Sequence, residues 1–415
     1  MTIGIVGIGY VGLPLAVALA EEGQRVVAVD VDSRKVEALR AGRSYVDDVD
    51  SARVAAVSDR IEATTRYAEL ARVEAILIAV PTPLTKNREP DLGPLVDAAR
   101  SLSGVLQAGQ LVVLESTTYP GTTRERLVPL LEESGLAAGS DFNVAFSPER
   151  IDPGRTDYTM SNTPKVVGGL TEDCLERAAA LYGDVCAEVV RVSTPEVAEL
   201  TKLLENIFRS VNIALVNELA VLCDRMGIDI WEVVDAAATK PYGFMRFEPG
   251  PGMGGHCLPV DPFYLAWRAR EFGQPTEFIE LAGEVNQEMP RFCADKVARA
   301  LNDLAKPVRG SRIAILGVSY KPGVGDLRES PALKIMNILR ERGGELVYHD
   351  EHVPELPGLG LTSLALNDAL ETCDVAVIVT AHPGLDPQEV VERAPLVVDF
   401  RGVTSGVGAG NVVRL

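Results

Sequence analysis

A run of closely spaced glycines, Gly7-Ile8-Gly9-Tyr10-Val11-Gly12, most constrains the fold that this chain can adopt. The run lies between a β-branched segment, Thr2–Val6, and an amphipathic segment, residues 13–22, so the expected order is strand, glycine turn and helix. In such a turn the first glycine permits the tight bend, the second leaves room for a pyrophosphate, and the third lets helix and strand pack closely. The pyrophosphate would accept hydrogen bonds from amides at the helix N-terminus.

Asp30 follows the second β-branched run, Arg25–Val29, at about the distance that a dinucleotide-binding motif requires. A carboxylate here would accept hydrogen bonds from the adenosine ribose and would repel a 2′-phosphate. The expected cofactor is therefore NAD rather than NADP. The alternative is a glycine turn that binds no ligand, with Asp30 as an ordinary turn residue.

Two parts of the chain alternate short β-branched runs with helical periodicity, for example at residues 33–41. This alternation predicts βαβ units and parallel sheets with helices on both faces, in residues 1–192 and again in 306–415. Residues 402–410 are rich in Gly, Ser and Ala, and are expected to be loosely ordered. The expected strands are Thr2–Val6, Arg25–Val29, 75–80, Leu111–Leu114, Asn143–Phe146, 165–168, Arg312–Leu316, Glu345–His349, 375–380 and 396–400.

Residues 193–305 are expected to form a central helical domain with one long helix. Ser193-Thr194-Pro195-Glu196 is a strong helix start, because a hydroxyl can cap the helix and proline needs no amide partner there. No helix breaker follows until Gly227, and a second helical region is expected over residues 262–303 with a break near Gly273. The predicted fold class is α/β, with two Rossmann-like parallel-sheet domains joined by this helical domain.

Composition excludes several classes of partner. Hydrophobic residues make up 47% of the 415 residues and charged residues 24%, as in soluble globular proteins with more than one domain. The net charge of −19 argues against nucleic acid or an anionic membrane as partner. No uninterrupted apolar run reaches the ~18 residues of a membrane span. Glycines interrupt the apolar N-terminus and no basic region precedes it, so we expect a first strand, no signal peptide and a cytoplasmic location.

Cys257 differs from the other cysteines in its surroundings. The segment Gly250-Pro251-Gly252-Met253-Gly254-Gly255 precedes it and Pro259 follows it, so irregular backbone with amide donors can stabilise a thiolate there. His256-Cys257 is a poor metal site, because no second Cys/His pair lies at ligand spacing. The alternative is that all six cysteines are free thiols, mostly buried. The six are Cys174, Cys186, Cys223, Cys257, Cys293 and Cys373.

Lys202 and Asn206 are four residues apart on the expected long helix and share one of its faces. Such a pair can hold a water or an oxyanion beside a substrate, although the spacing alone favours a solvated helix face. Asp261 follows Cys257 by four residues and can position a water or a lysine.

Six ordered motifs resemble the UDP-glucose/GDP-mannose dehydrogenase family over nearly the whole chain. Within that family, residues 81–91, 147–154 and 249–257 are most similar to the UDP-N-acetylglucosamine 6-dehydrogenase branch. UDP-glucose members carry a second Glu where this chain has Pro153, and this departure implies a differently shaped sugar pocket. The six motifs are residues 4–14, Ser116-Thr117-Thr118-Tyr119-Pro120-Gly121, Ser147-Pro148-Glu149-Arg150, residues 254–261, Tyr320-Lys321-Pro322 and residues 326–331.

The resemblance implies a four-electron oxidation of a UDP-sugar at C6, with two NAD per sugar and a uronate for polysaccharide biosynthesis as product. Cys257 would form a thiohemiacetal and then a thioester, and Lys202 and Asn206 would stabilise the oxyanions. Asp261 would assist proton transfer and share a water with Thr117, and Glu149 would help to activate the hydrolytic water.

The resemblance also implies binding residues and a homodimer through the central helix, in which Arg246 serves the partner's site. Cofactor contacts are expected from Gly7, Gly9, Tyr10, Val11, Gly12, Asp30, Arg34, Thr82, Thr117 and Arg328. Substrate contacts are expected from Glu149, Arg150, Lys202, Asn206, Arg246, Gly254, Lys321 and Arg401.

Three alternatives stay open at this point. UDP-N-acetylmannosamine or UDP-glucose could be the substrate in place of UDP-N-acetylglucosamine. A two-electron hydroxyacid dehydrogenase shares the glycine turn and a Lys/Asn helix pair, but needs neither Cys257 nor a second α/β domain. A catalytically silent sugar-nucleotide binder would not need the full set of catalytic side chains.

Overall fold

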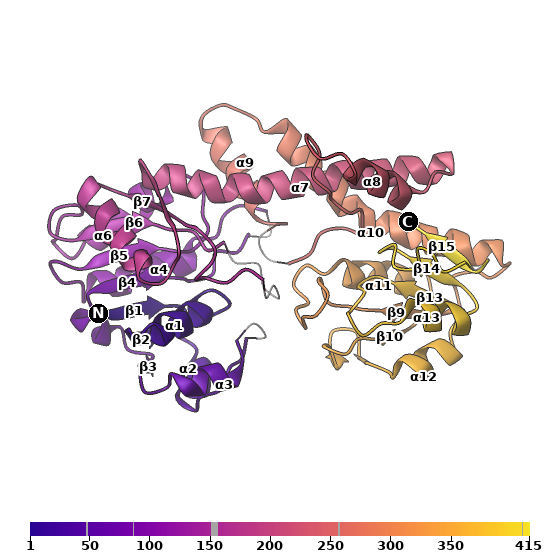
Figure 1. Ribbon diagram of the computed structural model, residues 1–415, viewed down its shortest axis with the longest axis horizontal. Coiled ribbons are helices and arrows are strands. Elements are labelled where there is room, and N and C mark those ends of the chain that lie inside the picture. Colours follow the sequence, from indigo (N-terminus) through magenta and orange to yellow (C-terminus); the bar gives the residue numbers. More distant parts are fainter. Residues whose placement is uncertain (47–48, 86, 151–156, 256–257, 409) are drawn as a thin grey trace. The chain divides into compact units, whose positions relative to one another are not determined.

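The computed structural model describes residues 1–46, 49–85, 87–150, 157–255, 258–408 and 410–415 (Figure 1). The chain forms two compact units: unit 1 is Met1–Glu205 with Phe263–Pro275, and unit 2 is Asn206–Pro262 with Thr276–Leu415. The long helix α7 (Pro195–Met226) and helix α9 (Asp261–Glu271) therefore each contribute residues to both units. The division into three domains at residues 192 and 305 stays a prediction.

Unit 1 is built on an eight-stranded sheet with the strand order β3-β2-β1-β4-β5-β6-β7-β8. Neighbouring strands are parallel, except that β6 and β7 are antiparallel. The order of the first six strands is that of a dinucleotide-binding sheet. The strands are β1 (Thr2–Val6), β2 (Arg25–Val29), β3 (Ile61–Thr64), β4 (Ala75–Ile78), β5 (Leu111–Leu114), β6 (Asn143–Phe146), β7 (Lys165–Gly169) and β8 (Val189–Val192).

Both faces of this sheet are buried. In β4, Leu77 belongs to one apolar cluster while Ile76 and Ile78 belong to another, because successive side chains of a strand point to opposite faces. Strands that are apolar throughout are typical of parallel sheets covered by helices on both sides (Figure 1). The covering helices are α1 (Gly12–Glu21), α2 (Ser33–Arg40), α3 (Ser51–Ala56), η1 (Tyr67–Arg72), α4 (Gly93–Ser103), η2 (Thr123–Leu127), α5 (Val128–Glu132) and α6 (Glu172–Gly183).

Helix α7 begins at Pro195, as the sequence predicts, and runs for 32 residues to the position before Gly227. The Thr194 hydroxyl accepts a hydrogen bond from the Val197 amide at 3.3 Å and so caps the first turn. Among the described residues α7 is long and apolar enough to cross a membrane, with a mean hydropathy of 1.3 and 39% of that window buried. Long core helices have the same properties, and polar side chains such as Asn206 and Asn217 are buried on α7.

Unit 2 contains a five-stranded parallel sheet with the order β10-β9-β13-β14-β15 and an apolar cluster on each face. The two parallel-sheet regions and the helical region with one long helix confirm the predicted fold class. Helix α8, strand β15 and the β11–β12 hairpin were not predicted. The elements are α8 (Ile230–Ala238), α10 (Glu277–Asp303), β9 (Arg312–Leu316), α11 (Pro331–Glu341), β10 (Glu345–His349), β11 (Glu355–Leu356), β12 (Leu361–Thr362), α12 (Leu366–Glu371), β13 (Val375–Ile378), α13 (Pro387–Arg393), β14 (Val397–Asp399) and β15 (Val412–Arg414).

Candidate active site

The three glycines of the turn after β1 have different steric surroundings. At Gly7, where φ is 89°, an added Cβ would lie 2.7 Å from the Ala79 carbonyl oxygen. At Gly12 it would lie 1.8 Å from the Gly7 carbonyl oxygen, whereas at Gly9 it would meet nothing within 4 Å. Because no described protein atom excludes a side chain at Gly9, the open space there suits a bound pyrophosphate.

Asp30 lies at the carboxyl end of β2, beside the glycine turn, and is buried. Its carboxylate accepts hydrogen bonds from the amides of Ile8 and Asp32, both at 2.9 Å, and the Lys35 ammonium lies 3.1 Å away. These contacts hold the carboxylate where the ribose hydroxyls of NAD would bind, so the residues present fit this cofactor. Lys35 was not predicted, although it lies in the first turn of α2.

Arg34, a predicted cofactor residue, is exposed and pairs with Asp32 at 2.8 Å. The hydrogen bond from Arg34 lowers the pKa of Asp32 to about 2. Tyr10 is exposed, and Val11 is half-buried directly before α1. Tyr10 and Arg34 belong to the same unit as Asp30. Asp32, which pairs with Arg34, is the residue directly before α2.

Thr82 and Thr117 are brought together at the carboxyl ends of β4 and β5. The Thr82 hydroxyl donates a hydrogen bond to the Thr117 carbonyl at 2.8 Å, and the Tyr264 hydroxyl donates one to the Thr82 carbonyl. Ligands of open parallel sheets bind at this edge. The two predicted cofactor residues therefore lie together near the glycine turn, whereas Tyr264 was not predicted from the sequence.

Glu199 on α7 holds the loop that contains Thr117. Its buried carboxylate accepts hydrogen bonds from the Gly121 amide at 2.6 Å and from the amide and hydroxyl of Thr123 at 2.8 and 2.7 Å. Burial raises the pKa of Glu199 to about 7, although these hydrogen bonds act in the opposite direction. Sequence reasoning missed this residue, because a Glu on an amphipathic helix is expected to be solvated.

The raised pKa of Glu199 predicts a pH dependence of stability. The folded chain binds this proton more tightly than the unfolded chain, whose Glu keeps its ordinary value of 4.5. The contribution of Glu199 to the free energy of unfolding is therefore fully present below pH 4.5. It falls by about 3 kcal/mol as the pH rises through 7. Urea unfolding at several pH values should show a steeper decline for the wild type than for Glu199→Gln. Equal slopes in the two proteins would contradict the assignment.

A buried ionic cluster lies at the carboxyl edge of the same sheet. The Lys165 ammonium lies 2.6 Å from a Glu115 carboxylate oxygen and 3.8 Å from one of Glu149, and the Tyr182 hydroxyl donates a hydrogen bond to Glu115. Burial raises the pKa of Glu115 even though Lys165 acts against it. For Lys165, burial lowers the pKa, but the two carboxylates outweigh it and the net shift is upward. The cluster therefore contains one predicted catalytic residue, Glu149, and three residues that were not predicted.

Arg150 and Lys202 complete the predicted substrate residues of unit 1. The Arg150 guanidinium pairs with Glu205 on α7 at 2.7 Å and donates to the Pro164 carbonyl at 2.6 Å. Lys202 is buried on the same helix, and among the described residues no group accepts a hydrogen bond from its ammonium. A buried cation without an anionic partner is costly, so this position suits an oxyanion of a ligand.

In unit 2, the structure joins Asn206 to Asp261. The Asn206 amide donates a hydrogen bond to the Asp261 carboxylate at 2.5 Å, and both side chains are buried. Cys257 and His256 lie outside the described residues. Asp261, four residues after Cys257 in the sequence, begins α9. Asn206 lies one helical turn beyond Lys202 on α7. Two predicted catalytic residues from distant parts of the sequence are thus in direct contact.

The glycine-rich loop before Cys257 packs against the segment that contains Lys321 and Arg328. The Gly255 amide donates a hydrogen bond to the Arg328 carbonyl at 2.9 Å. A Cβ at Gly254 would lie 2.6 Å from Tyr320 Cβ, so only glycine allows this approach. The structure therefore places Gly254 beside the segment between β9 and α11 that contains Lys321 and Arg328.

Two buried asparagines, not predicted from the sequence, anchor this loop. Asn217 on α7 accepts a hydrogen bond from the Gly250 amide at 2.9 Å and donates one to Asn286 on α10 at 2.9 Å. Asn286 in turn donates to the Ser210 carbonyl at 3.0 Å. Buried amides that satisfy one another in this way fix the backbone of the loop.

The remaining arginines differ in their partners. Arg328 forms a two-point ion pair with Asp326, with nitrogen–oxygen distances of 2.6 and 2.9 Å. Arg401 donates to the Val379 carbonyl at 2.6 Å, and its guanidinium borders Gly250. Arg246 is exposed and pairs with Asp235 and Glu248.

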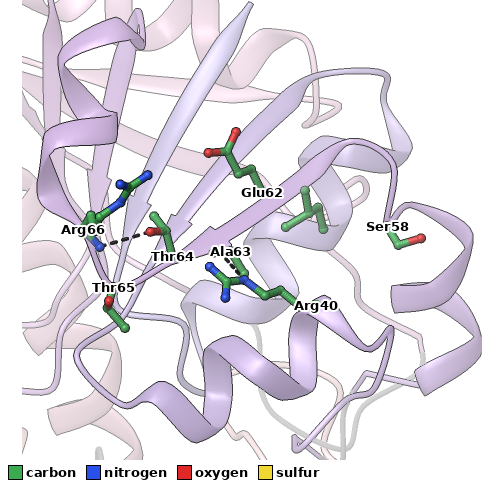
Figure 2. Close-up of a pocket in the computed structure, with 8 residues that line it drawn as sticks. Arg40, Ser58, Glu62, Ala63, Thr64, Thr65 and Arg66 are labelled. Carbon is green, nitrogen blue, oxygen red and sulfur yellow. Dashed lines mark hydrogen bonds between the residues drawn. The ribbon is translucent and has the colours of Figure 1, made fainter.

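A surface hollow lies at edge strand β3 (Figure 2). Its lining contains none of the predicted site residues. Within the described ranges, no group of three or more His, Cys, Asp or Glu side chains could hold a metal ion. The hollow is lined by Arg40, Ser58, Ile61, Glu62, Ala63, Thr64, Thr65 and Arg66.

Three family models of the UDP-glucose/GDP-mannose dehydrogenase family match the chain. Its NAD binding domain matches residues 1–186, its central domain residues 196–288 and its UDP binding domain residues 314–406. The chain is 37% identical to protein CapL of Staphylococcus aureus over 410 residues, which cover 97% of this chain and 96% of that protein.

Two further relatives are named for their substrates. UDP-N-acetyl-D-glucosamine 6-dehydrogenase of Pseudomonas aeruginosa is 38% identical over 343 residues, or 82% of this chain and 80% of that protein. The structure of UDP-D-ManNAc dehydrogenase from Pyrococcus horikoshii matches with a TM-score of 0.92 and 33% identity, covering 100% of this chain and 99% of that one. The chain belongs to the UDP-glucose/GDP-mannose dehydrogenase family and is an NAD-dependent UDP-sugar dehydrogenase.

Proposed function

We propose that the chain oxidises the C6 hydroxyl of UDP-N-acetylglucosamine to the carboxylate in two successive two-electron steps, through a covalent intermediate on Cys257. The observation that carries the proposal is the Asn206–Asp261 hydrogen bond at 2.5 Å, which joins two of the catalytic residues expected from the sequence. The choice of sugar is supported by the sequence around Glu149 and Cys257 and by the 38% identity to the Pseudomonas aeruginosa enzyme. UDP-N-acetylmannosamine, the substrate named for the Pyrococcus horikoshii protein, is the second candidate.

The chemistry divides between the cofactor and the chain. NAD, held by the glycine turn and Asp30, would supply the hydride acceptor for each of the two oxidations. In the chain, the Cys257 thiolate adds to the C6 aldehyde after the first oxidation, and the resulting oxyanion takes up a proton to give a thiohemiacetal. Loss of that proton and of a hydride in the second oxidation leaves a thioester on Cys257.

Hydrolysis of the thioester completes the reaction. A water oxygen bonds to the C6 carbonyl carbon, one of its protons passes to Glu149, and the carbon–sulfur bond then breaks to release the Cys257 thiolate. Lys202 and Asn206 stabilise the oxyanion that forms when the thiolate adds to the aldehyde and the one that forms when water adds to the thioester. A preorganised cation or donor in a dry site contributes several kcal/mol to such a step. The buried ammonium of Lys202 supports this role, because no described protein group takes up its charge.

Asp261 and Thr117 position a water and assist proton transfer, while the other expected side chains bind the two nucleotides. The expected NAD contacts are Gly7, Gly9, Tyr10, Val11, Gly12, Asp30, Arg34, Thr82, Thr117 and Arg328. The UDP-sugar is bound by Arg150, Gly254, Lys321 and Arg401.

The proposed active form is a homodimer in which Arg246 serves the site of the partner. Eight exposed apolar side chains on α7 are spaced three, four or seven residues apart and share one face of the helix. Packing against a second copy of the chain would bury this apolar stripe. The stripe consists of Val197, Leu200, Leu204, Phe208, Leu215, Leu219, Leu222 and Met226.

Charged substitutions on the exposed face of α7 test the proposed dimer. The double substitution Leu204→Glu with Leu219→Glu should convert the protein to a monomer in size-exclusion chromatography with light scattering, because it buries two charges in an apolar interface. Leu304→Glu, at a leucine outside α7 whose exposure lies between those of Leu204 and Leu219, is the matched control and should leave the oligomer intact. A monomeric wild type would remove the homodimer from the proposal.

The substrate and the stoichiometry are tested together. The enzyme and NAD are mixed separately with the UDP derivatives of N-acetylglucosamine, N-acetylmannosamine, glucose and galactose, and with GDP-mannose. The highest kcat/KM is expected for UDP-N-acetylglucosamine, with two NADH formed per sugar. One NADH per sugar would instead support a two-electron dehydrogenase, and a higher kcat/KM for another sugar would overturn the choice of substrate.

A further inference from the structure

The antiparallel strand β7 brings Lys165 to the edge of the sheet where Glu149 lies. Strands β5 and β6 run in parallel, and Glu115 and Glu149 follow their carboxyl ends. Because β7 is antiparallel to β6, its first residue, Lys165, lies at that same edge. Phe146 pairs with Gly168, and continuing this register along the chain sets position 149 opposite position 165. A parallel β7 would have placed its first residue at the other edge.

The ammonium of Lys165 lies near two carboxylates that differ in exposure. It contacts Glu115 at 2.6 Å and lies 5.1 Å from the centre of the Tyr182 ring. Glu115 is fully buried and also accepts the Tyr182 hydrogen bond, so its carboxylate is fixed. A carboxylate oxygen of Glu149 lies 3.8 Å from the ammonium, and 17% of the Glu149 side chain is exposed. The cation is therefore held by a fully buried carboxylate within reach of one that is partly exposed.

We infer that Lys165 is a positioning residue for Glu149 in thioester hydrolysis, and that Glu115 and Tyr182 hold Lys165 in place. The inference rests on the role of Glu149 in the proposed function. A carboxylate that takes a proton from water must keep both its charge and its orientation, and a fixed ammonium at one of its oxygens provides both. Stability alone explains the cluster poorly, because apolar residues of the same volume often stabilise a core as well as a buried ion pair does.

The variants are chosen so that the protein folds. Lys165→Met alone would leave Glu115 charged and buried, so the test uses the double variant Lys165→Met with Glu115→Gln, which removes both charges. Lys165→Arg keeps the cation and should retain most activity. The matched control is Lys296→Met with Asp224→Asn, which removes another lysine–carboxylate pair, between a buried lysine on α10 and a half-buried aspartate on α7. Thermal unfolding of all variants reports whether each is folded.

The expected result is a stall after the second oxidation. With UDP-N-acetylglucosamine and NAD, the Lys165→Met/Glu115→Gln protein should form two NADH per site rapidly and then turn over about 100-fold more slowly than the wild type. Mass spectrometry of the stalled protein should show the uronyl group on Cys257. Hydroxylamine attacks a thioester without help from a base, so it should restore turnover. The Lys296→Met/Asp224→Asn control should turn over at the wild-type rate.

Two outcomes separate this inference from the proposed function. If Glu149→Gln stalls with the adduct but Lys165→Met/Glu115→Gln does not, the positioning role of Lys165 is wrong and the role of Glu149 stands. If Glu149→Gln turns over normally, the role of Glu149 itself fails. A slow first oxidation in the Lys165 variant, without adduct and without rescue by hydroxylamine, would indicate a merely structural role.

Discussion

Cys257→Ser is expected to reduce uronate formation by more than about a thousandfold while NAD binds with unchanged affinity. A serine hydroxyl is far less acidic than a thiol, so it supplies almost no anion at neutral pH and forms no thioester. The first oxidation does not need the thiol, and the variant should therefore form at most one NADH per sugar. Rapid-quench measurement of NADH and of the sugar products checks both statements.

The other cysteines provide the matched control. Burial raises the pKa of the Cys186 and Cys373 thiols to about 11, so neither is a thiolate at neutral pH. Cys373→Ser should accordingly keep wild-type turnover, and the buried thiols should resist alkylation by iodoacetamide under conditions that inactivate the enzyme. Undiminished turnover of Cys257→Ser would remove this residue from the mechanism.

Gly9→Ala and Gly12→Ala are expected to fail in two different ways. At Gly9 a Cβ meets no described protein atom, so stability should be unchanged, but the methyl group occupies the space that suits the pyrophosphate. We expect NAD to bind at least about tenfold more weakly, a loss of 1.4 kcal/mol. At Gly12 the Cβ would lie 1.8 Å from a backbone oxygen, and the helix must move away from the strand. This should cost about 3 kcal/mol and lower the melting temperature by roughly 5–10 °C.

Two measurements on each variant separate these effects. Calorimetry without ligand gives the melting temperature, and titration with NAD gives the dissociation constant. Gly104→Ala is a suitable control, because it lies outside the turn in an αR conformation with only one atom near its Cβ, at 3.8 Å. Normal NAD binding by Gly9→Ala would contradict the position assigned to the pyrophosphate.

Most strands and the long helix could be predicted because their signals are local. Thr2–Val6, Leu111–Leu114 and Arg312–Leu316 are apolar runs bounded by polar residues or by glycine, and the structure has strands with these bounds. Strand β8 is exposed or half-buried along its length and lacks such a signal. The direction of β7 could not be predicted at all, since parallel and antiparallel strands of this length have the same composition.

The candidate site could be predicted in part, for a related reason. The glycine turn, Asp30 and the motif around Cys257 are contiguous in sequence, so a single local pattern reveals each of them. Glu199, Lys165 and Asn217 stand alone in the sequence, where a solvated helix face or strand end is the expected environment. Their roles depend on partners 16 to 78 residues away.

The sequence by itself determined the α/β fold class, the NAD-binding turn and the family, because each depends on periodicity or on short motifs that keep their meaning outside the folded chain. Only the tertiary structure decided which charged groups are buried together. The carboxylates Glu115 and Glu149 share one ammonium, and Asn206 meets Asp261, because strand direction and helix packing bring distant segments to one place. Burial then changes the pKa values of Glu115 and Glu199, and no local pattern contains that information.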